Sequence, residues 1–66
     1  MWIRAHFNNG DEVIIQTKNI TCFYKDQSAG ANKDTIIQFV GNEDNYIIVQ
    51  ESVNEIRERI MDALNV

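Results

Sequence analysis

The stretch that decides the fold runs from Tyr46 to Leu64 and reads YIIVQESVNEIRERIMDAL. Its first four residues are β-branched or aromatic, which predicts a strand that is buried on both faces. Ser52 follows, with Glu55 three residues later. A serine at this spacing accepts from the backbone N–H of Glu55, while the glutamate reaches back to the N–H of Ser52. This capping box predicts a helix that begins at Val53.

The residues after the cap repeat with the period of an amphipathic helix. The apolar stripe consists of Val53, Ile56, Ile60, Ala63 and Leu64. The face expected to meet water consists of Asn54, Glu55, Arg57, Glu58, Arg59 and Asp62. Glu55 and Arg59 are four residues apart, so we expect them to pair. The polar face is mixed in charge, which favours a helix that covers a sheet over one that lies on a membrane.

Length and charge limit the class of protein. The 66 residues allow one domain, spanning 1–66, and the formal net charge is −4. Such a charge argues against a nucleic-acid binder. One cysteine excludes an intramolecular disulfide, which favours a reducing, cytoplasmic location. No apolar run approaches the length of a membrane span, so no membrane partner is expected.

The first part of the chain predicts a β-hairpin. Alternation from Trp2 to Asn8 indicates a strand, and a second strand is expected from Glu12 to Gln16. The Asn-Gly pair between them is the favoured pair for a type I′ turn, whose two central residues both have positive φ.

Three more strands are expected before the helix. They span Ile20–Lys25, Thr35–Val40 and Tyr46–Val49. The imperfect alternation after Ile20 indicates a bulge or a strand covered on both faces. The polar segment from Asp26 to Asp34 predicts a mobile hairpin loop.

The predicted fold is therefore α+β. It consists of a small antiparallel five-stranded sheet or half-open barrel, in the order βββββα, with one C-terminal helix packed on one face. The other face would then carry apolar residues, namely Trp2, Ile14, Ile36, Val40 and either Ile47 or Ile48. Such a face is unusual on a monomer, so either the sheet curls or it packs on a second copy. We favour a homo-oligomer, most simply a twofold dimer.

No catalytic, metal or cofactor site is predicted. His6 is the only histidine and has no acid or nucleophile nearby in the pattern, so it is expected on a sheet surface. Cys22 lies inside a strand and is expected to be a small buried residue. The best candidates for an interface are Trp2 and Tyr24, as amphipathic aromatics, with Arg4, His6 and Ile14.

The segments TIIQF at 35–39 and YIIVQESVNEI at 46–56, preceded by the Asn-Gly hairpin, resemble the FlbD family of small flagellar-operon proteins. The chain is also similar to small proteins of Firmicutes phages and mobile elements, some of which begin Met-Trp-Ile-Arg. The loop from Lys25 to Lys33 is longer than expected for the flagellar relatives, which favours the phage setting. The resemblance implies no catalytic residue and an action through protein contacts.

These observations predict a non-enzymatic, self-associating interaction module that also binds another macromolecule. One alternative is a phage inhibitor that uses acidic loops as a decoy for a basic surface of a host defence or transcription protein. Another is an oligomeric sponge for a small nucleotide signal, in which Arg4, Lys25 and Lys33 contact phosphate.

Overall fold

The observed architecture is α+β, with antiparallel strands and one C-terminal helix, as predicted. The computed structural model describes residues 1–29 and 34–64. Its elements in chain order are β1 (Trp2–His6), β2 (Glu12–Gln16), the 3-10 helix η1 (Thr17–Asn19), β3 (Ile20–Lys25), the 3-10 helix η2 (Gln27–Ala29), β4 (Thr35–Phe39), β5 (Tyr46–Val49) and α1 (Val53–Leu64).

The first hairpin forms, but with a different turn. β1 ends at His6 rather than Asn8 and pairs antiparallel with β2. Gly10 has a φ of 92°, and no non-glycine residue in the described ranges has a positive φ, so the type I′ prediction is wrong. The Gly10 N–H donates to the Phe7 carbonyl at 2.9 Å, and the Phe7 N–H donates to the Asp11 carbonyl at 2.9 Å. This is the pattern of a three-residue loop that ends in a left-handed glycine.

The strands form two sheets, so the predicted continuous five-stranded sheet is wrong. One sheet has the order β1-β2 and the other has the order β3-β4-β5. The chain turns through η1 after β2, and the register of β3 shifts between Ile20 and Cys22, which favours the first of the two alternatives for this strand, a bulge, over coverage on both faces. Both features turn β3 away from β2. An isolated bridge between Phe7 and Val49 connects the two sheets.

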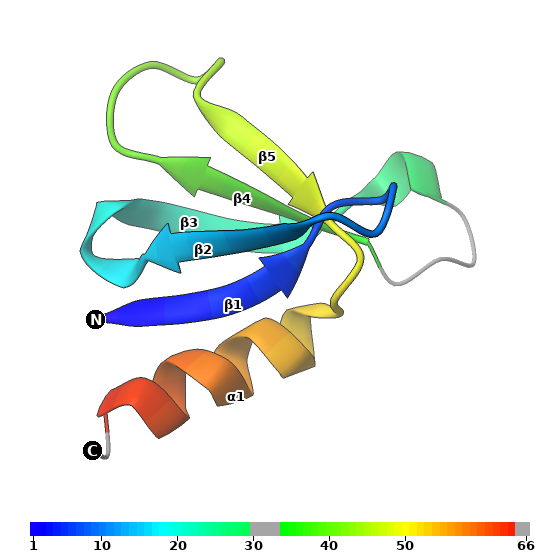
Figure 1. The fold of residues 1–66 in the computed structure, drawn as a ribbon. Coiled ribbons are helices and arrows are strands. Elements are labelled where there is room, and N and C mark those ends of the chain that lie inside the picture. The colour runs from blue at the N-terminus through cyan, green and yellow to red at the C-terminus, as the bar shows by residue number, and fades with distance from the viewer. Residues whose placement is uncertain (30–33, 65–66) are drawn as a thin grey trace.

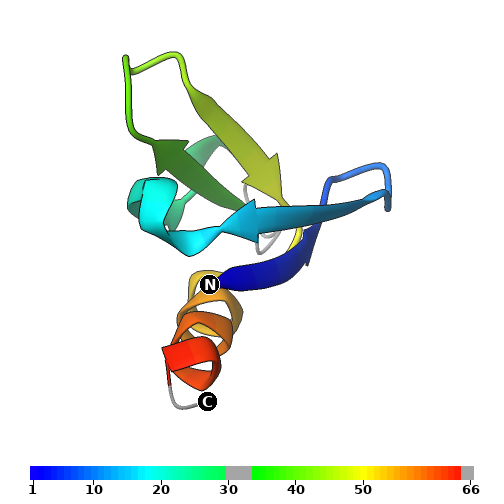
Figure 2. The ribbon, with the colours of Figure 1, turned by 60° about the vertical axis from the view of Figure 1, so that its left-hand side comes forward.

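The core lies between the two sheets and the helix. Ile3, Ala5 and Ile15 are buried on the hairpin, and Ile37 and Val49 are buried on the second sheet. The alternation along each strand places these residues on one face. The buried Ile56 completes the core from α1, which packs against β1 and β3. The helix runs beside β1 and therefore touches both sheets rather than one face of a single sheet (Figures 1 and 2).

The apolar residues predicted for one outer face are divided between the two sheets. Trp2 and Ile14 are exposed on the hairpin. Ile36 and Ile48 are paired neighbours on the second sheet, both half-buried, and Val40 is exposed beyond the end of β4. The protein therefore has two separate outer faces.

The helix begins where the capping residues predict. The Ser52 Oγ accepts from the Glu55 N–H at 3.1 Å, but its hydroxyl donates to the Glu55 carboxylate at 3.3 Å in place of the expected return bond to the Ser52 N–H. The predicted pairing of Glu55 with Arg59 is wrong, because Arg59 turns toward β1. The prediction that β5 is buried on both faces is also wrong, since Tyr46 is exposed.

The predicted loop from Asp26 to Asp34 begins with η2. The Asp26 N–H donates to the Asp34 carbonyl at 3.0 Å, and Asp26 Oδ1 accepts from the Ser28 hydroxyl at 2.6 Å. The remainder of the predicted loop, residues 30–33, lies outside the described residues, and so does the predicted phosphate contact Lys33.

Candidate functional site

A buried carboxylate connects the segment before α1 to β1. The side chain of Glu51 is 5% exposed. Its Oε2 lies 2.7 Å from His6 Nδ1 and accepts from Arg59 Nη1 at 2.8 Å, and its Oε1 accepts the backbone N–H of His6 at 2.9 Å. We call Glu51, His6 and Arg59 the Glu51 clamp.

The clamp and its neighbours satisfy the backbone of β1 on the edge that faces away from β2. Arg59 Nη1 donates to the Arg4 carbonyl at 2.6 Å, and the Gln50 N–H donates to the His6 carbonyl at 2.8 Å. Gln50 Nε2 also donates to the carbonyl of Phe7, the residue that follows β1, at 2.9 Å. An open strand edge is a template for pairing with another chain. These contacts therefore close part of β1 to strand addition.

The hydrogen bonds of the clamp keep Glu51 ionised. Burial raises the pKa of Glu51, but the hydrogen bonds from the His6 side chain, the His6 backbone and Arg59 together outweigh it and lower the pKa from 4.5 to about 2. The charge is therefore retained inside the protein at neutral pH. Three donors surround it, which is the condition under which a buried charge is tolerated.

The sequence pattern shows no acid close to His6, but the fold brings Glu51 to it from 45 residues away. A carboxylate on an imidazole is one part of a general-base arrangement, which also needs a nucleophile next to the ring. Cys22 lies in the other sheet, where its Sγ donates to Gln38 Oε1 at 3.4 Å, and it is exposed rather than buried as predicted. The geometry of the clamp therefore fits a structural role.

Three of the five predicted interface residues lie together. Arg4 and Ile14 are directly opposite in the β1-β2 register, and Trp2 follows on the same face. Trp2 is 63% exposed and Ile14 is 50% exposed. His6 belongs to the clamp instead, and Tyr24 lies on the other sheet. The five candidates are therefore divided among the hairpin surface, the clamp and the second sheet.

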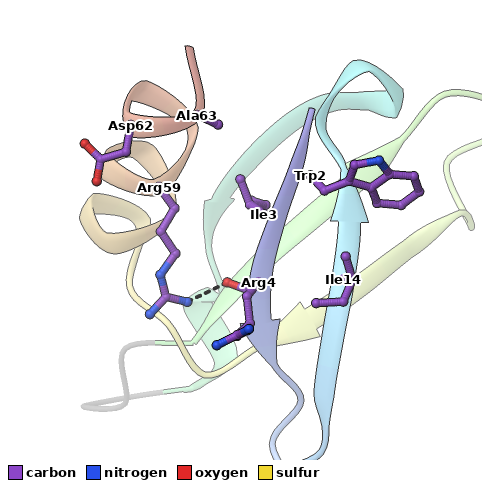
Figure 3. A pocket seen from close by; sticks show the side chains of 7 residues that line it. All are labelled: Trp2, Ile3, Arg4, Ile14, Arg59, Asp62 and Ala63. Atoms are coloured by element: carbon purple, nitrogen blue, oxygen red, sulfur yellow. Dashed lines mark hydrogen bonds between the residues drawn. The ribbon is translucent and has the colours of Figure 1, made fainter. Parts of the chain in front are cut away.

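The hairpin surface continues into a groove with α1. The groove has a volume of about 560 Å³, and its lining consists of Trp2, Ile3, Arg4, Ile14, Arg59, Asp62 and Ala63. Figure 3 shows β1 between the helix on one side and Trp2 and Ile14 on the other. The helical lining was missed from the sequence, which placed Arg59 and Asp62 in water and Ala63 in the apolar stripe. No pattern in the chain relates the last helical turns to the first strand.

The outer face of the second sheet forms a separate surface. Pairing places Tyr24, Ile36 and Ile48 in one row across the three strands, and Cys22, Gln38 and Tyr46 in the next row. We call these six residues the β3–β5 face. Tyr24 is 44% exposed and Tyr46 is 48% exposed. The face carries no charged side chain.

The acidic residues do not form one surface. Asp11 and Glu12 follow the β1-β2 turn, and Glu43 and Asp44 lie in the β4-β5 connection; all four are exposed. The two connections lie at different ends of the molecule (Figures 1 and 2). A decoy for one basic patch would need them side by side.

Metal sites, membrane-spanning helices and matches to known proteins were also considered. In the described ranges no group of three or more His, Cys, Asp or Glu side chains could hold a metal ion. The one α-helix in these ranges is too short and too polar to cross a membrane. Comparisons with protein-family models, curated proteins and solved structures find no match. The resemblance to the FlbD family and to phage proteins therefore stays a prediction, and function is argued from the geometry.

Proposed function

We propose that the protein is a non-enzymatic interaction module that self-associates as a twofold dimer through the β3–β5 face. The observation that carries this proposal is the absence of charge on that face. Charged residues make up 24% of the chain, yet the six side chains that share this surface include none. Depletion of charge together with exposed aromatic residues is the composition that distinguishes the core of an interface from other surfaces.

The shape of the face suits a second copy. An isologous contact places the same patch on both sides of a twofold axis, so a neutral patch meets no like charge. Sheets stack at about 10 Å with their side chains interdigitated. Ile36 and Ile48 would lie at the centre. Tyr24 and Tyr46 would bury their rings and keep their hydroxyl groups toward water.

The hairpin surface is less suited to self-association. It carries the Arg4–Glu12 ion pair, whose Nε–Oε2 distance is 3.0 Å and whose side chains are 67% and 49% exposed. We assign this surface to a different partner, in line with a module that has one self-contact and one outward contact. The non-enzymatic character is supported by His6, which is held by Glu51, and by its separation from Cys22 into another sheet.

The test is the solution mass by light scattering. The chain has a mass of 7.6 kDa, so we expect twice that value for the unmodified protein and 7.6 kDa for Tyr24→Glu. Ile14→Asp is the matched control, because it adds a charge at a similarly exposed residue of the other sheet. Circular dichroism checks that both variants are folded.

The outcomes separate the surfaces. Dissociation by Tyr24→Glu alone supports the β3–β5 face. Dissociation by Ile14→Asp alone would move the contact to the hairpin, and a monomeric unmodified protein would overturn self-association.

A further inference from the structure

From the groove between the hairpin and α1 we infer a second function that is independent of self-association: the binding of a nucleoside monophosphate. The volume of about 560 Å³ lies within the range of small-molecule sites. The lining combines an aromatic ring, aliphatic side chains and two guanidinium groups. This is the combination that an aromatic ring joined to an anion requires.

The anionic part of the ligand is assigned to the two arginines. Arg59 is held in place, because Nη1 donates both to Glu51 and to the Arg4 carbonyl. A guanidinium has five N–H donors, so three of those on Arg59 remain for a ligand. Arg4 uses its Nε for Glu12 and keeps its two terminal nitrogens. Guanidinium forks match the oxygens of a phosphate in pairs.

The backbone of β1 adds a donor at the same place. The Arg4 carbonyl points toward α1, since it accepts from Arg59. In an antiparallel pair the N–H and C=O of one residue point to the same side, so the Arg4 N–H also faces the groove. A phosphate at this edge would meet side-chain and main-chain donors together.

The aromatic part of the ligand is assigned to Trp2. Its indole is 63% exposed and lies beside Ile14, across β1 from the helix (Figure 3). Stacking of a base on an aromatic side chain is worth about 1–3 kcal/mol. An exposed indole next to an aliphatic side chain offers such a platform.

Spacing favours a nucleotide over a simple aromatic acid. Trp2 and Arg4 are two residues apart on one strand face, so their Cα atoms lie roughly 7 Å apart, and their side chains diverge from β1 (Figure 3). A ligand with a spacer such as a sugar between its ring and its anion therefore matches these two groups better than a ring that carries the anion directly. The net charge of −4 disfavours a polyanion, so the ligand is a single nucleotide rather than a nucleic-acid strand. The Asp62 carboxylate points away from β1 at the rim.

The test is isothermal titration calorimetry of the full chain with adenosine monophosphate, adenosine and inorganic phosphate as separate probes. We expect saturable binding of the monophosphate. Adenosine and inorganic phosphate should each bind at least roughly 10-fold more weakly than the monophosphate, because charge-assisted hydrogen bonds and stacking both contribute.

Two variants separate the contributions, and a third is the control. Arg4→Gln should lower the affinity for the monophosphate by about 10-fold and leave the affinity for adenosine unchanged. Trp2→Leu should lower the affinity for both the monophosphate and adenosine by a similar factor of about 10. Arg57→Gln is the matched control, since Arg57 is exposed on the same helix, contacts Asn54 and does not line the groove.

Three results would overturn the inference. They are no saturable binding up to about 1 mM, equal binding of monophosphate and adenosine, and equal binding of monophosphate and inorganic phosphate. Equal loss in Arg57→Gln and Arg4→Gln would also overturn it, because it would indicate a general charge effect. Tyr24→Glu, which tests self-association, should leave the affinity unchanged.

Discussion

Removing the charge of Glu51 should lower the free energy of unfolding substantially. Glu51→Gln keeps the volume of the side chain but replaces one carboxylate oxygen with an NH₂ group. That oxygen lies 2.7 Å from His6 Nδ1 and 2.8 Å from Arg59 Nη1, so one position would now bring donors together. The partly buried donors of His6 and Arg59 would lose this acceptor.

The magnitude follows from the pKa. The carboxyl group changes from a pKa of 4.5 to about 2 on folding, and each unit corresponds to 1.36 kcal/mol, so the ionised group contributes roughly 3 kcal/mol at pH 7. A chain of 66 residues has a total stability of roughly 3–10 kcal/mol. The variant should therefore lose between a third and all of its stability.

The sign of the pH dependence is fixed by the direction of the shift. Because the folded-state pKa of Glu51 is lowered, the contribution is complete above pH 4.5 and is lost as the pH falls toward 2. Roughly half should remain at pH 3. Urea denaturation followed by far-ultraviolet circular dichroism at pH 7, 5 and 3 measures the difference between the unmodified protein and the variant.

Glu12→Gln is the control for this experiment. It removes an exposed carboxylate of β2 that pairs with Arg4, and exposed pairs contribute about 0–1 kcal/mol. A loss below about 0.5 kcal/mol in Glu51→Gln at pH 7 would refute the reasoning. A loss that stays constant between pH 7 and pH 3 would show that packing, not charge, is responsible.

Three further changes test separate features. Gly10→Ala should cost about 1 kcal/mol in the free energy of urea unfolding through the backbone alone, because φ is +92° and nothing lies within 4 Å of the added Cβ; no loss would exclude the left-handed glycine. Ser52→Ala should cost about 1 kcal/mol in the same assay by removing the helix cap, and Ser52→Asp should restore it; equal loss in both would contradict a capping role. Cys22 lies on the β3–β5 face, so its reaction with a maleimide should slow as protein concentration rises; a rate independent of concentration would count against burial of this face in a dimer.

Local features of the fold could be predicted from the sequence because neighbouring residues encode them. The cap at Ser52 and the start of α1 depend on a four-residue pattern. The bounds of β2 follow from alternation, and those of β3 and β5 from runs of β-branched and aromatic residues between polar turns. The bulge after Ile20 was visible as broken alternation. The prediction of a type I′ turn was wrong because an Asn-Gly pair also fits the three-residue loop, in which only Gly10 is left-handed.

Features that depend on distant residues could not be predicted. The division into two sheets depends on the direction in which the chain leaves η1 and enters β3. Glu51 was unremarkable as an acid after a strand, and His6 as a polar residue on a strand face. The pairing of the end of β1 with the end of β5, through the Phe7–Val49 bridge and the hydrogen bond from the Gln50 N–H to the His6 carbonyl, brings these two positions together. The groove was missed for the same reason, since Arg59 is assigned to water by helix periodicity alone.

The Glu51 clamp also has a consequence for the order of folding. Each sheet is made of antiparallel strands consecutive in the chain, so each can form as soon as it is synthesised. The bond from His6 to Glu51 spans 45 residues and forms only after the later residue has left the ribosome. β1 is therefore made well before the residues that cover its edge. Until those residues are in place, this edge is open to pairing with a neighbouring chain.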